Sequence, residues 1–273
     1  MSLQRLLPVL IVAVLAAGGG ALWLQPQLSD AGSGAPPDTG MTVGDALLAT
    51  ESAGSTRLSE QFLILAASWQ PAFCETAPRR PECTSMTAER YDASHFALHG
   101  LWPQGEYCGV PTAIAERDRT GSWSDLPPVE LDAELAARLS RTMPGTQSGL
   151  ERHEWIKHGT CLGGSAAQYY EISLAFMAAL NASGVREQFA DNVGGRLTRA
   201  DIRDAFDAAF GAGAGQRVRV SCVEDDGRLL IDEITIGLWG VPAPEADFGA
   251  LMLAARPTDG GCDGGIVDPV GDQ

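Results

Sequence analysis

The sequence predicts an α+β fold, in which a central, mostly antiparallel sheet is packed with several helices. Residues 217–223 alternate between polar and apolar side chains, Asp225-Asp226-Gly227 signals a turn, and residues 229–236 run back. This pattern is typical of an antiparallel hairpin. The predicted helices do not alternate strictly with the strands, which indicates α+β architecture.

The first 58 residues precede the predicted folded domain, which covers residues 59–273. Residues 6–24 carry no charge and follow a single arginine, which is typical of an export signal. An uncleaved N-terminal membrane anchor is the alternative, because this stretch is long enough to span a bilayer. Residues 25–58 are rich in proline, glycine and serine, and they predict a flexible linker.

Two strands are expected at the start of the domain. Residues 62–67 are a continuous apolar run, which predicts a central strand buried on both faces. Residues 94–103 predict a second strand that ends at Pro103. Because strand side chains alternate between faces, Phe96 and Leu98 are expected on one face and His99 on the other, near the strand's end.

Helices are expected in the middle of the chain. Residues 111–128 contain prolines and predict a loop, whereas residues 129–143 have the apolar spacing of an amphipathic helix. Two further helices are expected to begin at Ser165 and Thr198. Ser165 forms a capping box with Gln168, and Thr198 has the same spacing to Asp201, with aspartate as the acid.

Composition limits both the compartment and the partners. The chain has six cysteines, which in an oxidising compartment predict three disulfides, and the count alone leaves fifteen pairings open. A local bridge between Cys74 and Cys83 is geometrically easy. The formal net charge of -16 argues against a general nucleic-acid binder, so any polyanion must be held locally.

Residues 153–158 contain two histidines, a carboxylate and the only lysine of the chain. If this segment is helical, Glu154 lies beside His158 and His153 lies beside Lys157. Glu154 would then orient the ring of His158 and raise its proton affinity, while Lys157 and His153 would form a cationic patch for an oxyanion or phosphate. The segment predicts a proton-transfer site for a negatively charged substrate.

Two alternatives apply to this cluster. The order His-Glu is shared with the zinc-protease pattern HExxH, but that pattern needs two histidines four residues apart. Here His153 and His158 are five apart and position 157 is lysine, so we exclude a zinc protease and expect no metal site. In isolation the cluster also fits a solvated helix start with one core histidine.

Two segments together resemble the active-site segments of the ribonuclease T2 family: residues 99–103, His-Gly-Leu-Trp-Pro, and residues 153–161, His-Glu-Trp-Ile-Lys-His-Gly-Thr-Cys. Residues 68–74 are similar to that family's opening strand and loop. The likeness covers residues 61 to about 262. It implies a ribonuclease T2-like fold and an endoribonuclease that cleaves single-stranded RNA without metal or cofactor, through a 2',3'-cyclic phosphate.

Carried over residue by residue, the resemblance implies roles for five side chains. His158 would be the general base on the 2'-hydroxyl, and His99 the general acid on the leaving 5'-oxygen. Glu154 and Lys157 would stabilise the charged phosphorane. His153 would hold the phosphate.

The resemblance also bears on substrate contacts and disulfides. Trp102 would support the site or stack a base. Gln70 and Gln104 are candidates for contacting bases. The implied pairings are Cys74 with Cys83, Cys108 with Cys161, and Cys222 with Cys262.

We therefore expect an exported protein, periplasmic or extracellular, with residues 1–24 as a candidate membrane anchor. It is expected to be a monomer whose substrate is single-stranded RNA and not DNA, because DNA lacks the attacking hydroxyl. Two other functions remain open: an exported binding or inhibitor module with the same fold and no turnover, and a secreted phosphodiesterase for small nucleotides.

Overall fold

The computed structural model describes residues 58–121 and 123–271. The predicted export segment (residues 1–24) and the predicted linker, apart from its last residue, lie outside the described residues. That last residue, Leu58, is buried and packs against the hydrophobic core. Within the described residues, no helix is both long and apolar enough to cross a membrane.

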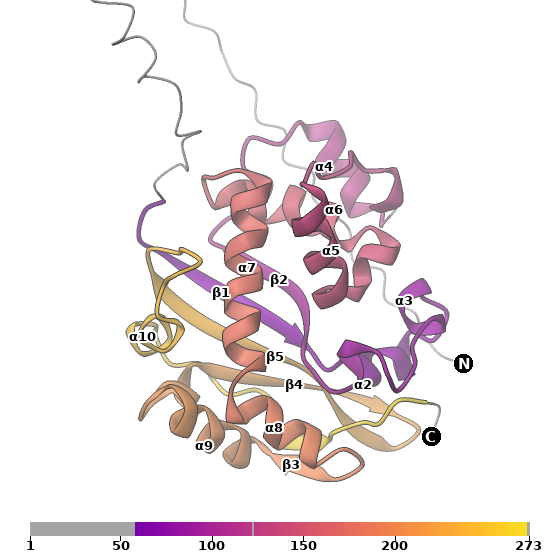
Figure 1. Cartoon of the computed structure of the whole chain (residues 1–273), viewed down its shortest axis with the longest axis vertical. Coiled ribbons are helices and arrows are strands. Elements are labelled where there is room, and N and C mark those ends of the chain that lie inside the picture. Colours follow the sequence, from indigo (N-terminus) through magenta and orange to yellow (C-terminus); the bar gives the residue numbers. More distant parts are fainter. Residues whose placement is uncertain (1–57, 122, 272–273) are drawn as a thin grey trace, which may run out of the picture. The chain divides into compact units, whose positions relative to one another are not determined.

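The described residues form one six-stranded sheet with the order β2-β1-β5-β6-β3, and β4 pairs with β5 (Figure 1). The pairings are antiparallel except that between β5 and β6, which is parallel. The strands are β1 (Gln61–Ser68), β2 (Ala97–Pro103), β3 (Arg196–Thr198), β4 (Val218–Asp225), β5 (Arg228–Gly240) and β6 (Gly264–Ile266). The predicted α+β fold with a mostly antiparallel sheet is confirmed, as is the hairpin, which β4 and β5 form.

The strand β1 is central, as predicted, because it pairs with β2 on one side and with β5 on the other. Leu63 and Leu65 point into the hydrophobic core, whereas Phe62 and Ile64 are only half-buried. The prediction that this strand is buried on both faces is therefore wrong at its start. One face packs against helices, and the other is less covered there.

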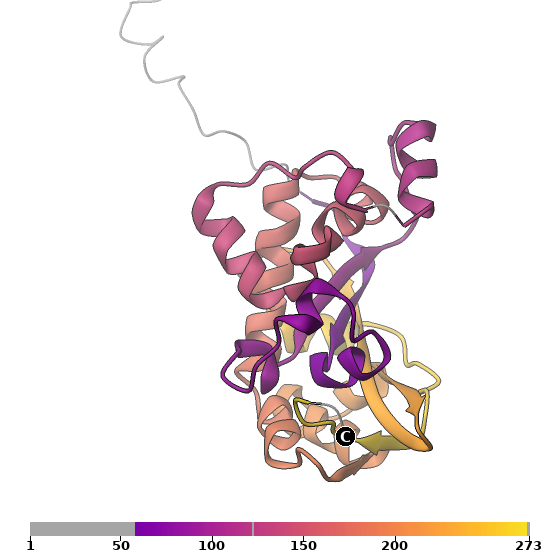
Figure 2. The ribbon, with the colours of Figure 1, turned by 90° about the vertical axis from the view of Figure 1, so that its right-hand side faces the viewer.

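Helices cover the core face of the sheet (Figures 1 and 2). The long helix α7 packs against β1 and β2, and α5 packs against α7. The α-helices of the described residues are α2 (Gln70–Thr76), α3 (Pro81–Thr84), α4 (Thr112–Arg119), α5 (Ala133–Thr142), α6 (Leu150–Lys157), α7 (Ala166–Asn181), α8 (Gly184–Asp191), α9 (Arg199–Phe210) and α10 (Phe248–Ala254).

Side-chain caps fix where several of these helices begin. The predicted starts at Ser165 and Thr198 are confirmed, since each side chain accepts a hydrogen bond from the backbone N–H three residues later. The helix expected from residue 129 begins instead after Asp132, whose carboxylate accepts a hydrogen bond from the N–H of Leu135. The four residues before Ala133 do not join the helix because the cap comes later than the apolar spacing implies.

The prediction of a loop over residues 111–128 is wrong, because α4 occupies Thr112–Arg119. Pro111 precedes the helix, where its missing N–H costs nothing, so this proline starts a helix instead of excluding one. Buried Asp118 fixes α4 to the domain by accepting hydrogen bonds from Tyr107 and His153.

Three disulfides pair all six cysteines as the resemblance implies: Cys74–Cys83, Cys108–Cys161 and Cys222–Cys262. The second joins the chain just after β2 to the short turn Gly159–Cys161 that follows α6. The strand and the helix that carry the predicted site residues are thus covalently linked near their ends.

Candidate active site

His99 lies in β2 at an irregularity of the sheet. Gly100 pairs with Ala66 and Leu98 pairs with Ala67, so His99 is an extra residue opposite that step. The bulge leaves the side chain about one-third exposed, with its Nδ1 atom 2.6 Å from Oε2 of Glu233 on β5. The bulge, and not the regular alternation of the strand, brings the His99 side chain to Glu233.

The pKa of the His99 imidazole is raised above its ordinary value of 6.5. Burial alone would lower this pKa, but the hydrogen bond to Glu233 and the negative charges of Glu154 and Glu233 outweigh that effect. His99 is therefore held toward its protonated form.

Glu154, on α6, is buried against β2. Its Oε2 atom accepts a hydrogen bond from Nε1 of Trp102 at 2.9 Å, and its Oε1 atom lies 3.8 Å from the Nε2 atoms of both His99 and His153. A Cβ atom on Gly100 would lie 1.8 Å from Oε2 of Glu154, so the glycine is what lets the carboxylate reach this position.

Burial raises the pKa of Glu154 to about 7, although the positive charge of His99 and the hydrogen bond from Trp102 oppose the shift. Its Oε1 atom is buried and has no hydrogen-bond partner among the described residues. An unpaired carboxylate oxygen between two imidazoles can accept a proton or hold a cationic ring.

His158 directly follows α6 as its C-terminal cap, and it is 8% exposed. Burial lowers its pKa to about 3, and the positive charges of Lys157, His153 and His99 add to the effect. The expectation that Glu154 raises the proton affinity of His158 is therefore wrong. The carboxylate of Glu154 turns toward Trp102 and His99 on β2.

Trp102 links the two histidines. Its ring lies 5.2 Å from the ring of His99 and 5.5 Å from that of His158, measured between centroids. The site therefore contains one imidazole held toward the protonated form and one held neutral, both next to the same indole.

His153 is fixed from two sides. Its Nδ1 atom lies 2.7 Å from Oδ1 of Asp118, and its ring stacks on Trp123 with centroids 4.4 Å apart. Burial lowers the pKa of His153, while Asp118 acts in the opposite direction. The ring is also 6.4 Å from that of His158, so its Nε2 edge faces the same site.

Lys157 lies close to this group, since its charge acts on the pKa values of His153, His158 and His99. Its Nζ atom lies 3.5 Å from Oε1 of exposed Glu106. That ion pair is weak at a solvated position, so the ammonium can turn to an incoming anion.

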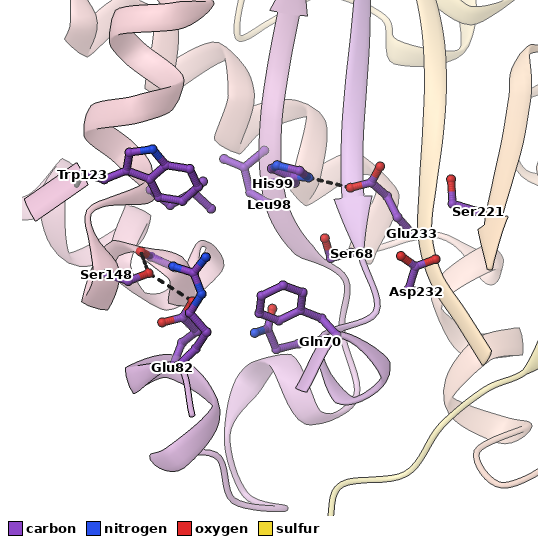
Figure 3. A pocket seen from close by; sticks show the side chains of 14 residues that line it. Ser68, Gln70, Glu82, Leu98, His99, Trp123, Ser148, Ser221, Asp232 and Glu233 are labelled. Carbon is purple, nitrogen blue, oxygen red and sulfur yellow. Dashed lines mark hydrogen bonds and ion pairs between the residues drawn. The ribbon is translucent and has the colours of Figure 1, made fainter. Parts of the chain in front are cut away.

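A pocket of about 390 Å³ opens beside His99 (Figure 3). Gln70 lies in this pocket, as its predicted role in base contact requires. Gln104 does not, and it lines a different pocket. The pocket is lined by Ser68, Gln70, Phe73, Arg80, Glu82, Leu98, His99, Trp123, Gly145, Ser148, Leu150, Ser221, Asp232 and Glu233.

Three residues of the site were not predicted from the sequence. Glu233 had a signal, because the acidic pair Asp232 and Glu233 interrupts an apolar strand between Ile231 and Ile234. Asp118 and Trp123 had none, since they belong to the segment that was predicted as a loop. Within residues 58–121 and 123–271, histidine, cysteine and acidic side chains form no group of three that could hold a metal ion.

Comparison with known proteins gives relatives over most of the domain. Ribonuclease I of Escherichia coli (strain K12) is 28% identical over 228 residues, which cover 73% of this chain and 82% of that protein. Ribonuclease MC of Momordica charantia is 26% identical over 181 residues, which cover 60% of this chain and 89% of that protein.

The crystal structure of RNase NT in complex with 5'-AMP superposes with a TM-score of 0.51 at 18% identity, covering 77% of this chain and 98% of that one. At this identity the likeness shows the fold alone. The model of the Ribonuclease T2 family matches residues 60–248, which is more than half of the chain and includes both histidine segments. The chain belongs to the ribonuclease T2 family.

Proposed function

We propose that this protein is a metal-independent endoribonuclease that cleaves single-stranded RNA through a 2',3'-cyclic phosphate. The observation that carries the proposal is the placement of two imidazoles against Trp102, with the environment raising the pKa of His99 and lowering that of His158. Transfer of RNA phosphate needs one group that removes a proton and one that supplies a proton.

In the proposed reaction, neutral His158 takes the proton of the 2'-hydroxyl, and the 2'-oxygen forms a bond to phosphorus. The bond from phosphorus to the 5'-oxygen breaks, and protonated His99 gives its proton to that leaving oxygen. The products are a 2',3'-cyclic phosphate and a 5'-hydroxyl. A bound phosphate adds negative charge beside the three cations that lower the pKa of His158, and so makes it a stronger base.

The remaining charged groups act on the phosphorane. We assign Lys157 and His153 to its stabilisation and to phosphate binding, because the charge of Lys157 acts on all three histidines of the site and Nε2 of His153 lies 3.8 Å from Oε1 of Glu154. Glu154 keeps its free oxygen 3.8 Å from both His99 and His153, so it orients these rings and holds their positive charge in the site.

The pocket beside His99 is assigned to the base of the leaving nucleoside. His99 protonates the 5'-oxygen of that nucleoside, and the same side chain lines the pocket, so the base that follows the cleaved bond is the one within reach. Gln70 supplies an amide for hydrogen bonding there, and Phe73 an aromatic face. Trp102 contacts the rings of both His99 and His158 and supports them.

The three disulfides support an export route, because such bonds form and persist outside the reducing cytosol. We propose a periplasmic or extracellular location, with residues 1–24 as the export signal or membrane anchor. The domain is proposed to act as a monomer.

A direct test incubates the purified protein with a fluorescent RNA oligonucleotide and with its DNA counterpart, each with and without EDTA. RNA is expected to be cut equally with and without EDTA, and DNA to stay intact. Cleavage that EDTA abolishes, or equal digestion of DNA, would contradict the mechanism. Binding of RNA without any cleavage would favour the alternative of a binding module.

A further inference from the structure

A second pocket, of about 410 Å³, lies at the far end of β5 from Glu233. We call it the Trp239 pocket. It is lined by Phe62, Gln104, Trp239, Ala254, Ala255, Arg256, Pro257 and Thr258. Figure 1 shows that α10, which ends at this pocket, and α2, which carries Gln70, lie at opposite ends of β1 and β5.

The side chains of the Trp239 pocket suit a nucleobase. Trp239 is 44% exposed, which is unusual for so large an apolar ring, and half-buried Phe62 lies directly opposite it in the strand pairing. Arg256 and Gln104 add a guanidinium and an amide, and no acidic side chain from the part of the chain that the structure describes lines the pocket. Arg256 is exposed and forms no ion pair among the described residues. Exposed aromatic rings with a cationic neighbour bind single-stranded nucleic acid by stacking.

This pocket and His99 share one face of the sheet. Along β5, Glu233 and Trp239 are six residues apart, so both point to the same face, while Ile234, Ile236 and Leu238 point into the core. The pairing of β1 with β5 runs without a bulge from Gln61 to Ser68, so that the alternation is unbroken.

The order of residues along β2 sets the direction of an RNA strand on this face. His99 lines the first pocket, Trp102 follows near His158, and Gln104 comes just after the strand in the Trp239 pocket. Since the first pocket takes the base that follows the cleaved bond, the Trp239 pocket lies on the side that precedes it. Six strand residues span about 20 Å, which is about six stacked nucleotides at about 3.4 Å each and fewer if the RNA is extended.

We propose that the Trp239 pocket is a second RNA-binding site, which stacks a base several nucleotides upstream of the cleaved phosphate. The inference rests on the proposed ribonuclease function for its direction along the strand. It gives an acidic protein a local means of holding longer RNA, with the bases bound by aromatic rings and the backbone by an unpaired arginine. Chains that are too short to reach the pocket lose this contribution.

The test measures binding of 2'-O-methyl RNA, in which the attacking hydroxyl is blocked, to the purified full chain. Dinucleotides and octamers extended on the 5' side are compared by fluorescence anisotropy for wild type, W239A, W239F and V241A. Val241 is the matched control, because it directly follows β5, is also 44% exposed and is not among the residues that line the pocket.

Wild type and V241A are expected to bind the octamer more tightly than the dinucleotide. W239A should reduce this gain about 5- to 150-fold, the effect of one lost stacking contact, and W239F should keep most of it. A gain that is the same in W239A and wild type overturns the proposal, as does the absence of any gain in wild type.

Cleavage of unmodified RNA by the wild-type chain separates this result from the fate of the proposed function. If wild type cuts no RNA but its octamer binding depends on Trp239, the nuclease assignment fails and the binding site stands. If wild type cuts RNA, and W239A gains as much affinity from dinucleotide to octamer as wild type does, the nuclease assignment holds and the second binding site is ruled out.

Discussion

The indole nitrogen of Trp102 donates a hydrogen bond to Glu154 across 2.9 Å, and this contact joins the strand that carries His99 to the helix that His158 follows. The carboxylate is buried, and only a glycine at position 100 leaves room for it. The two histidines are thus positioned by a shared indole and a shared carboxylate, with the Cys108–Cys161 disulfide nearby.

His99→Ala and His158→Ala are each expected to lower kcat on an RNA oligonucleotide by about 100- to 10,000-fold, because each removes a group that transfers a proton. The matched control is His95→Ala, since His95 stacks on Tyr91 outside the site. Circular dichroism checks that each variant stays folded. A His99 or His158 variant that keeps a near wild-type rate would mean that its role is misassigned.

Glu233→Gln is expected to move the alkaline limb of the pH–rate profile to lower pH. His99 must be protonated, so activity falls as pH rises through its pKa, which the hydrogen bond and charge of Glu233 raise. The limb should not move in Glu224→Gln, an exposed acid on the neighbouring strand. An alkaline limb at the same pH in both variants would remove Glu233 from this role.

On the acid side, the rate is expected to persist in weakly acidic buffer. The pKa of His158 is lowered to about 3 in the free protein, so its imidazole stays neutral well below pH 6. Measurement of kcat/KM from pH 4 to 9 checks this point, because that ratio reports the free enzyme. A steep loss already below pH 7 would place the base elsewhere.

Glu154→Gln is expected to lower kcat and to raise the free energy of unfolding at high pH. The folded chain holds the proton of Glu154 to about pH 7, whereas the ordinary pKa is 4.5, so stability falls as pH rises through this window. At pH 8 the variant is expected to gain up to about 3 kcal/mol in the free energy of unfolding, and at pH 4 almost none. Its kcat is expected to fall about 100-fold.

Denaturant unfolding at the two pH values measures the stability of this variant, and RNA cleavage measures its rate. Equal gains at pH 4 and pH 8 would show that the carboxylate is not the source of the pH dependence.

Gly100→Ala is expected to displace Glu154 and to lower both stability and activity. The added Cβ would lie 1.8 Å from Oε2 of Glu154 and 2.6 Å from Nε1 of Trp102, so the contact between them must break. Overpacking of this kind costs about 1–3 kcal/mol. Gly184→Ala is the control, because a Cβ at that position meets nothing within 4 Å. A melting temperature that falls equally in both variants would contradict the explanation.

Residue patterns predicted much of this fold, because its elements carry local signals. The hairpin of β4 and β5 follows from alternation around a turn, and the helices that start after Ser165 and Thr198 follow from caps. The helix α4 was missed because the prolines that flank it indicated a loop, and because Asp118, which anchors it, bonds to Tyr107 and His153 outside the helix.

The candidate site was predicted in its residues but not in its contacts. Helical spacing put Glu154 beside His158, yet the carboxylate turns to Trp102, fifty-two positions earlier in the chain. The bulge at His99 and its bond to Glu233 depend on the register of three strands, which no local pattern encodes. Pairings of this kind arise only when the sheet is assembled.

The most direct test of the two-histidine reaction is the identity of the new ends on a defined RNA oligonucleotide, read by mass spectrometry after brief digestion in EDTA. We expect a 2',3'-cyclic phosphate on one fragment and a 5'-hydroxyl on the other, with both absent when a 2'-O-methyl group blocks the cleaved position. Fragments that carry a 5'-phosphate, or cleavage at the blocked position, would contradict attack by the 2'-oxygen.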